Sequence, residues 1–554
     1  MASGVPTGAP RQSPAPPPAR PASAAPPAEE IKGAFGTIHV SEDGHRGLRS
    51  RVLALLAIIG PGLIVLIGDN DAGGVSTYAQ AGQQYGPSLL WVLLLLIPVL
   101  IVNQEMVVRL GAVTGVGHAK LIIERFGRGW GWFESGYLLL QNFLIIVTEF
   151  IGVSLALSYF GVSPYISVPV AAAALVAVSA SGSFRLWERS MFLFMFGNLL
   201  MIPLFFLAHP RGGSIVHHLF VPGIRGGATS SAVLLLISIV GTTVAPWQLF
   251  FQQSNIVDKR ITPRWINYER LDTVIGAVIV VVGAGALICA TAFGLGGTHY
   301  FGDFNNAGQT ATDLKHAISP LAGGFFAVVL LNASLIGAGV VTLATSYVVG
   351  DVFGTRGSLH RSFLEAKGFY SVFIVVILAA AGIVLIPGAP LGVIIEAVQA
   401  LCGILLPMTT LFLLMLCNDR EVLGPWTNPP WLKALAAVIV GVLILLSLTL
   451  TVTTIFPGID VGRMFVIGAI VLGAVLAGMA LAAWRARPTS RQVAAVISAA
   501  ESEVPREQWT MPPSALLSRP QFSGPVRIAL LVLGAYMAVA LVMLIVKSVE
   551  LATS

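Results

Sequence analysis

The segment from Ile67 to Ser76 reads IGDNDAGGVS and interrupts an apolar run that begins near Val52. Two aspartates, an asparagine and three glycines stand where a membrane helix would otherwise continue. A lone break is more often a kink than a site, because neighbouring helices readily satisfy the freed backbone groups. A carboxylate inside a bilayer, however, costs about 2.5–3.5 kcal/mol on insertion scales, so such residues usually face a cavity and have a partner. The pair Asp69 and Asp71 therefore favours a cation site.

The composition around this break is that of a polytopic membrane protein. Of 554 residues, 55% are hydrophobic and only 10% are charged, which is too apolar for a soluble protein. Apolar runs of about 20 residues recur, each long enough to cross a hydrocarbon core of about 30 Å. The sequence predicts thirteen spans, at residues 52–84, 87–113, 131–160, 163–181, 187–208, 228–256, 270–295, 318–350, 363–387, 389–417, 431–456, 464–484 and 526–547.

These spans and the polar segments between them predict five parts of the chain. The first 45 residues are rich in Pro, Ala and Ser, cannot build a core and contain no signal-peptide apolar region. The predicted parts are a disordered cytosolic tail at 1–45, a ten-helix core at 46–420, transmembrane helices 11 and 12 at 421–484, a polar cytosolic segment at 485–525 and a further transmembrane helix at 526–554.

The distribution of Lys and Arg predicts which side of the membrane each loop faces. If the N-terminus is inside and the spans alternate, 27 of the 32 Lys and Arg residues fall on inner segments and 5 on outer ones. Cytoplasmic loops carry an excess of these residues in membrane proteins. We therefore expect a multi-pass protein of the plasma or inner membrane with a cytoplasmic N-terminus, and the net charge of +6 does not indicate nucleic-acid binding.

A second break is predicted in the sixth span, where Gly241 to Ser254 reads GTTVAPWQLFFQQS. Pro246 lacks a backbone donor and clashes with the preceding turn, and glycine tolerates the non-helical angles of an unwound segment. Breaks in spans 1 and 6 occupy corresponding places in two five-helix halves. This pattern is typical of inverted-repeat transporters, whose substrate site lies near the bilayer midplane between the halves.

The two breaks together offer oxygen ligands for a hard cation. The expected metal-binding residues are Asp71, Asp69, Gly68, Asn70, Gly74, Thr242, Ala245 and Gln248. No Cys, His or Met lies in either break, so carboxylate, carbonyl, hydroxyl and amide oxygens suit Mg²⁺, Mn²⁺ or Ca²⁺. Small residues such as Gly73, Gly74 and Ala245 leave room for the waters that Mg²⁺ gives up reluctantly.

A family resemblance rests on five stretches within about the first ten spans. They read GPGLIVLIGDNDAGGVSTYAQAGQQYGPSLLWVLL, RLGAVTG, EFIG, GTTVAPWQLFFQQS and LLPMTTLFLLMLCNDREVLG. These stretches resemble the natural resistance-associated macrophage protein (NRAMP) family of divalent metal transporters. The resemblance implies an all-α polytopic membrane protein with a LeuT-like 5+5 inverted repeat and broken helices 1 and 6, to which this chain adds C-terminal transmembrane helices.

The sequence departs from the family at its ligand positions. In the family's first-span motif, Asp-Pro-Gly-Asn, the aspartate aligns with Asp71 and the asparagine ligand with Gly74. In the sixth-span motif, Met-Pro-His, the methionine aligns with Ala245 and the histidine with Trp247, and the family's carbonyl ligand falls on Thr242. The soft methionine sulfur that favours transition metals in the family is absent. We therefore expect a larger and harder site.

The residues that carry the family's proton are also changed. Glu149 remains in the third span, but Ile146 stands at the position of the family's aspartate. Trp247 stands at the position of the family's histidine and is expected to fill the volume that the histidine would occupy. These changes resemble the NRAMP-related magnesium transporters, a branch that moves Mg²⁺ and Mn²⁺ without protons. Glu149 has two open interpretations, a hydrogen-bonded structural carboxylate and a proton or vestibule group. Gln399 in the tenth span either lines the outer pathway or packs within the helix bundle.

The expected function is import of Mg²⁺, and of Mn²⁺, as partly hydrated ions by alternating access without proton coupling. Three alternatives stay open: a proton-coupled Mn²⁺/Fe²⁺ symporter, a Na⁺-coupled organic-solute transporter of the same fold, and a sensor that binds metal without conducting it. The expected partners are the divalent ion and the lipid bilayer, with no nucleic acid, no resident cofactor and no enzymatic activity. The sequence leaves the oligomeric state open, and a monomer is one possibility.

Overall fold

A computed structural model describes residues 30–33, 36–39, 64, 65, 68, 70–354, 364–388, 390–456, 459–485, 505–513, 517 and 524–553. Up to the second break the elements are β1 (Glu30–Gly33), β2 (Gly36–His39), α3 (Ala72–Tyr85), η1 (Gly86–Leu89), α4 (Leu90–Thr114), α5 (His118–Phe126), α6 (Arg128–Tyr159), α7 (Pro164–Ala180), α8 (Phe184–Gly197), η2 (Asn198–Leu200), α9 (Met201–Leu207), α10 (Gly212–Phe220) and α11 (Ser230–Thr243). After it come α12 (Pro246–Asp258), η3 (Pro263–Trp265), α13 (Ile266–Leu295), α14 (Ala307–Ala317), α15 (Pro320–Phe353), α16 (Lys367–Val384), α17 (Leu391–Asn418), α18 (Arg420–Leu423), η4 (Gly424–Trp426), α19 (Pro430–Ile455), α20 (Val461–Arg485), η5 (Arg506–Gln508) and α22 (Gly524–Thr553).

The helices coincide with the predicted spans. Among the described residues, ten helical segments are long and apolar enough to cross a membrane, and Pro164–Ala180 and Leu530–Val542 are shorter apolar helices. The first two predicted spans meet in one such segment, Ala72–Thr114, in which η1 joins α3 to α4. Every predicted span thus has its helix, although residues 52–63 of the first span lie outside the described residues.

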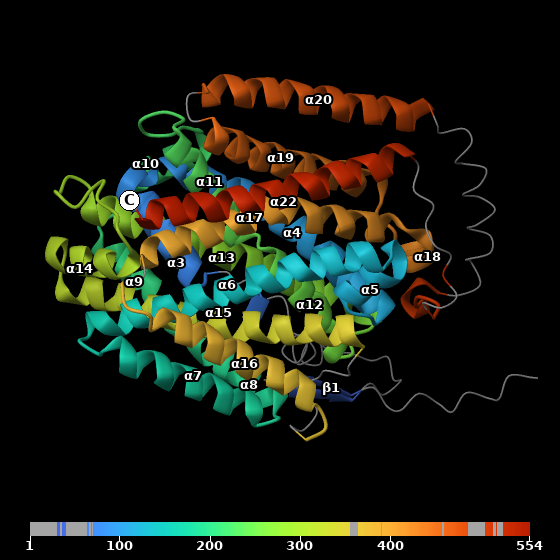
Figure 1. The fold of residues 1–554 in the computed structure, drawn as a ribbon, viewed down its shortest axis with the longest axis horizontal. Helices are drawn as coiled ribbons and strands as arrows, with labels where there is room; N and C mark the ends of the chain where they lie inside the picture. Colours follow the sequence, from blue (N-terminus) through green and yellow to red (C-terminus); the bar gives the residue numbers. More distant parts are fainter. Residues whose placement is uncertain are drawn as a thin grey trace, which may run out of the picture.

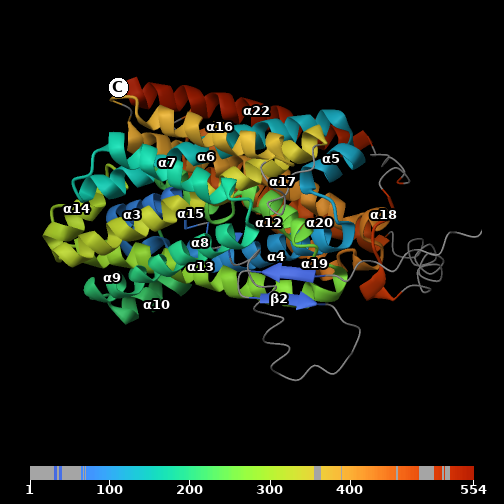
Figure 2. The ribbon, with the colours of Figure 1, turned by 90° about the horizontal axis from the view of Figure 1, so that it is seen from below.

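The long helices lie side by side along the longest axis of the molecule (Figure 1). Both views place α5 and α18 at one end and α14 with the C-terminus at the other (Figures 1 and 2). The connection between α12 and α13 contains η3, and that between α17 and α19 contains α18 and η4. We call the end that carries α5 and α18 the basic end, because it holds the loops in which Lys and Arg were predicted to gather.

Small residues allow the central helices to approach one another closely, as is usual in membrane bundles. The main packing pairs are α6 with α15, α3 with α13 and α11 with α17. On α11, a Cβ atom at Gly241 would collide with the backbone of α17 at Gly403. On α3, a Cβ atom at Gly82 would collide with Thr291 of α13. The α3–α13 contact joins the two five-helix halves, and the α11–α17 contact packs the sixth helix against the tenth within the second half.

Some elements were not predicted from the sequence. The strands β1 and β2 pair antiparallel inside the segment 1–45 that was predicted to be disordered, and β1 lies against α8. The rest of that segment lies outside the described residues. The short helices α5, α10 and α14 occupy connections between spans, and η5 lies in the polar segment 485–525.

Candidate metal site at two broken helices

The first break lies between a helical turn at Ile64 and the start of α3. The amide of Gly68 donates to the carbonyl of Ile64 at 2.8 Å, which closes that turn. Asp71 has an extended backbone conformation and caps α3, and its Oδ1 accepts a hydrogen bond of 2.6 Å from the amide of Gly74. Aspartate is a favoured cap because its carboxylate satisfies a free amide of the first turn. The predicted break is confirmed, while Asp69 lies outside the described residues.

The second break separates α11 from α12. Val244 and Ala245 leave the helical conformation. Val244 has a φ of −134° and a ψ of 74°. Ala245 has a φ of −85° and a ψ of 145°. Pro246 opens α12, where its missing N–H would have no helical partner anyway. The Tyr78 hydroxyl of α3 lies 2.8 Å from Oγ1 of Thr243 at the end of α11. This bond holds the second half of helix 1 against the first half of helix 6.

Two acidic side chains meet at the start of α3. Glu149 of α6 accepts a hydrogen bond of 3.0 Å from the amide of Ala72 through Oε2, and its Oε1 has no hydrogen-bond partner among the described residues. Gly337 of α15 lies against both acids, since a Cβ atom there would be 2.5 Å from Cδ of Glu149 and 2.9 Å from Cβ of Asp71. The partial positive charge of a helix N-terminus favours carboxylates at this place.

Further polar groups surround this pair. Thr242 of α11 is buried, and within the described part of the chain its hydroxyl has no hydrogen-bond partner. Gln399 of α17 packs directly against Gly73, where a Cβ atom would overlap its side-chain amide. Its Nε2 also has no hydrogen-bond partner in the part of the chain that the structure describes. The structure therefore brings Gln399, for which the sequence left the outer pathway and packing within the bundle both open, to the first break itself.

Three predicted residues have neighbours other than the two acids. Asn70 donates from Nδ2 to the carbonyl of Val280 on α13 at 3.4 Å, and no described residue bonds to its Oδ1. Gln248 accepts a bond of 3.2 Å from Nε2 of Gln104 on α4, which occupies its amide oxygen. Trp247 is fully buried and packs edge-on against Phe251, as expected of a side chain that fills space.

The break is enclosed in this conformation. Asp71 is 3% exposed, Thr242 1% and Ala245 2%. Among the described residues, no group of three or more His, Cys, Asp or Glu side chains is placed to hold a metal ion. The oxygen donors here are two carboxylates together with hydroxyl, amide and backbone groups. Such a set suits an ion that keeps part of its water.

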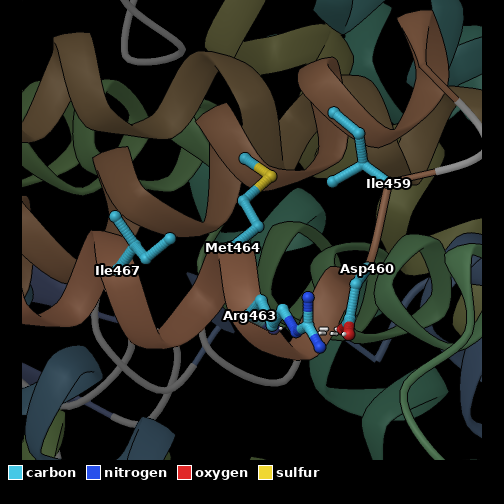
Figure 3. Close-up of a pocket in the computed structure, with 5 residues that line it drawn as sticks. All are labelled: Ile459, Asp460, Arg463, Met464 and Ile467. Atoms are coloured by element: carbon cyan, nitrogen blue, oxygen red, sulfur yellow. Dashed lines mark hydrogen bonds and ion pairs between the residues drawn. The ribbon is translucent and has the colours of Figure 1, made fainter.

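A hollow at the start of α20 is a poor alternative site (Figure 3). Its lining includes Asp460 and Arg463, which form an ion pair at 3.3 Å (Figure 3). The side chains of these two residues are 59% and 86% exposed. Exposed pairs of this kind contribute little and hold no ion away from water.

Sequence reasoning missed the residues that position the acids rather than the acids themselves. Gly337 carries a signal, since it lies in the small-residue stretch IGAG of the eighth span, but its partners are on other helices. Gln104 lies in the polar stretch NQE of the second span and Tyr78 in the stretch STYAQ of the first, so neither stands out from its neighbours. Their partners, Gln248 and Thr243, are more than a hundred residues away in the chain.

A helical core with its first and sixth helices broken around a buried acidic site defines a transporter of the LeuT-like inverted-repeat class. The chain belongs to the NRAMP family, whose family model, described as natural resistance-associated macrophage protein-like, matches residues 62–453. Members of this family are transporters, so the chain is a multi-pass membrane transporter and not an enzyme.

Several relatives and solved structures are similar to most of the chain. The divalent metal cation transporter MntH of Bacillus subtilis (strain 168) is 27% identical over 432 residues, which cover 74% of this chain and 94% of the relative. MntH 1 of Pseudomonas aeruginosa is 28% identical, over an alignment that covers 72% of this chain and 92% of the relative. The manganese transporter of Eremococcus coleocola, bound to an aromatic bis-isothiourea substituted compound, superposes with a TM-score of 0.56 at 19% identity and covers 79% and 94%. A mutant of that transporter superposes with a TM-score of 0.58, and the match covers 81% of this chain and 96% of the mutant. These structures confirm the LeuT-like fold.

Proposed function

We propose that this protein imports divalent cations, Mg²⁺ and Mn²⁺, as partly hydrated ions. The observation that carries the proposal is the buried carboxylate of Asp71 at the broken first helix, with Glu149 beside it and no soft donor in either break. The names of the curated relatives support a divalent metal as the substrate. Gly74 and Ala245, where the family has an amide and a thioether, favour the harder of the family's ions.

Each residue of the site has a proposed role. Asp71 is the principal ligand, and Asp69 adds negative charge or binds directly. Gly68 and Thr242 offer carbonyl oxygens, and the free Thr242 hydroxyl is a further donor. Gln248 lies in the outer shell, where the hydrogen bond that its amide oxygen accepts from Gln104 orients it.

The proposed transport cycle is alternating access driven by the membrane potential. One group of helices rocks against the other around the site, so that the ion meets each side in turn. With the basic end in the cytosol, a divalent ion that enters through 100 mV gains about 4.6 kcal/mol, at about 2.3 kcal/mol for each charge. No proton is needed to drive import of this kind.

A proton-coupled manganese symporter is the second candidate, and one observation favours it. The relatives bear the names MntH and manganese transporter, and Glu149 still contacts the first break. Against it, Ile146 and Trp247 replace the other two groups that carry the family's proton. A Na⁺-coupled organic-solute carrier would instead be inhibited by its solute and not by a competing divalent ion.

The proposal is tested by divalent-ion uptake into proteoliposomes. Asp71→Asn keeps a cap acceptor for Gly74 but removes the charge, so uptake of Mg²⁺ should fall by about ten- to a hundredfold, the effect of about 1.5–3 kcal/mol. Asp460→Asn, at an exposed aspartate, is the control and should transport like the wild type. Mn²⁺ should compete with Mg²⁺ in the wild type. Undiminished uptake by Asp71→Asn would disprove the proposal.

A further inference from the structure

A short segment between α20 and α22 is folded onto the basic end of the transporter. It comprises residues 505–513, which we call the strap, and it contains η5, Trp509 and Met511. The strap lies beyond residue 453, where the match to the family ends. Its contacts are therefore a property of this chain and are not implied by the family.

The strap is held on η4 by two aromatic residues. The indole of Trp426 donates to the carbonyl of Arg506 at 2.8 Å, and the guanidinium of Arg506 lies 4.1 Å from the centre of the same ring. The ring of Trp509 covers Gly424, where a Cβ atom would collide with it. Gly424 also has a φ of +47°, a conformation that side-chain-bearing residues rarely adopt.

The strap also contacts two other connections at this end. The amide of Met511 donates to the carbonyl of Val113, near the end of α4, at 3.1 Å. The helical turn η5 packs against η3, which lies between α12 and α13. One nine-residue segment thus touches α4, the α12–α13 connection and the α17–α19 connection.

These three places already meet in a charged junction beneath the strap. Arg109 of α4 donates to the carbonyl of Trp426 at 2.7 Å and to the amide oxygen of Asn428. Glu105, one turn earlier, pairs with Arg109 at 3.0 Å and with Arg270 of α13 at 2.6 Å. Trp426 therefore links the two: its carbonyl accepts a hydrogen bond from Arg109 of the junction, and its indole donates one to the strap.

The location of the strap relates it to the metal site through α12. This helix starts at the second break and ends at Asp258, five residues before η3 begins. If α12 moves away from α17 to open a path from the site to the basic end, η3 must move away from η4. The strap spans these two turns, so such an opening breaks its contacts with at least one of them.

We propose that the strap, residues 505–513, is a built-in brake that holds the basic end closed and slows its opening. The inference rests on the proposed transport function, because it concerns regulation of the same metal site. Release of the strap lowers the barrier to opening and raises the rate at which metal leaves at this end. A ligand or modification that removes the strap from η4 would activate transport.

The contacts of the strap are suited to reversible release. Most of its residues are exposed, and Trp509 and Met511 are half-buried. Burial, followed by repulsion from Arg270 and Arg109, lowers the pKa of Arg506. Arg506 therefore docks beside two other guanidinium groups, an arrangement that weakens the closed state relative to a neutral contact.

The test uses the full-length protein and a native thiol as reporter. Cys417 of α17 is buried behind the junction, with Sγ 3.5 Å from the carbonyl of Met106 on α4. Trp509→Ala and Arg506→Ala each remove one aromatic contact of the strap, and Gln508→Ala, at an exposed residue of the same turn, is the matched control. Alkylation of Cys417 by N-ethylmaleimide is followed by peptide mass spectrometry, and Mn²⁺ uptake is measured in proteoliposomes.

We expect both strap variants to raise the alkylation rate of Cys417 and the initial rate of Mn²⁺ uptake by about five- to tenfold, the range of a modest coupling between sites. Gln508→Ala should behave like the wild type. If the folded strap variants are alkylated and transport at wild-type rates, the brake is disproved while the transport function stands. If alkylation rises but no protein, the wild type included, moves metal, the brake stands and the transport function fails.

Discussion

At the scale of single residues, the site depends on a glycine as much as on its acids. Gly337 allows α15 to approach both Glu149 and Asp71. Any side chain at this position would push one of the carboxylates out of place. Its role is one of shape, and a variant can therefore test the geometry of the site without changing a ligand.

Gly337→Ala should lower Mg²⁺ uptake by about tenfold, because overpacking a buried position typically costs about 1–3 kcal/mol. The control is Gly324→Ala on the same helix, where an added Cβ atom meets nothing within 4 Å. Uptake is measured in proteoliposomes at equal protein content. Equal activity of the two variants would show that the close contact with the acids is unimportant.

A second residue-scale prediction separates the two interpretations of Glu149. Glu149→Gln keeps an acceptor for the Ala72 amide but cannot carry a proton. If the role is structural, uptake should stay within about fivefold of the wild type, because a neutral acceptor weakens the bond by about 1 kcal/mol. Glu149→Leu leaves that amide without a partner and should lower the thermal stability. A proton carrier would instead make Glu149→Gln as inactive as the leucine variant.

At the scale of elements, the two breaks decide which ions the site prefers. Gly74 lies in the first turn of α3 and Ala245 caps α12, so each is close to the unwound backbone. The double variant Gly74→Asn with Ala245→Met adds an amide oxygen and a thioether, and softer ions favour the thioether. We expect competition by Cd²⁺ and Mn²⁺ against Mg²⁺ to strengthen by about tenfold, equal to about 1.4 kcal/mol. An unchanged order of competition would refute the argument from ligand softness.

The packing of α5 on α12 gives a pH-dependent stability. His118 is buried, with Nδ1 2.6 Å from Oε1 of Gln253 and its ring edge-on to Phe250. Burial lowers the pKa of His118 from 6.5 to about 4, although the hydrogen bond with Gln253 acts in the opposite direction and raises the pKa. Because the pKa is lower in the folded state, the stability is fully present above pH 6.5 and is lost as the pH falls towards 4, by up to about 3 kcal/mol.

This prediction is checked by thermal unfolding in detergent between pH 7 and pH 4.5. His118→Gln should reduce the loss of stability at low pH, since its side chain does not titrate. His316→Gln, at an exposed histidine of α14, should leave the loss unchanged. If all three proteins lose the same stability on acidification, His118 is not responsible.

Local patterns predicted the spans and the breaks, because these features follow from neighbouring residues. The apolar runs predicted every described transmembrane helix. The Gly-Asp stretch predicted the break in the first helix, and the Ala-Pro stretch predicted the break in the sixth. The short helices α5, α10 and α14, of 9, 9 and 11 residues, escaped prediction because they are too short to form an apolar run that spans a membrane. The strands β1 and β2 lie in a segment whose composition indicates no core.

The site was predictable only in its residue types. Asp71 and Thr242 follow from the breaks, but the contact of Glu149 with the Ala72 amide depends on how α6 packs against α3. The same holds for Gln399 against Gly73, which joins residues more than three hundred positions apart. Such contacts are set by the packing of whole helices and leave no periodic signal in the sequence.

At the scale of the whole molecule, the structure shows an enclosed site, with a strap across the basic end. The thirteen predicted spans put the C-terminus on the side opposite the N-terminus, and α22 ends far from α5 and α18 (Figure 1). Import by the membrane potential requires only that the enclosed ion be released at the basic end. The claim that no proton accompanies it concerns the complete cycle and is tested on the intact transporter.

The most direct measurement follows Mg²⁺ entry and lumenal pH together in proteoliposomes under an imposed, inside-negative potential. Uncoupled import predicts that Mg²⁺ enters at a rate that rises with the potential while the lumenal pH stays constant. An outward-directed proton gradient should leave that rate unchanged. Acidification of the lumen in step with Mg²⁺ entry would contradict the account and favour a proton-coupled symporter.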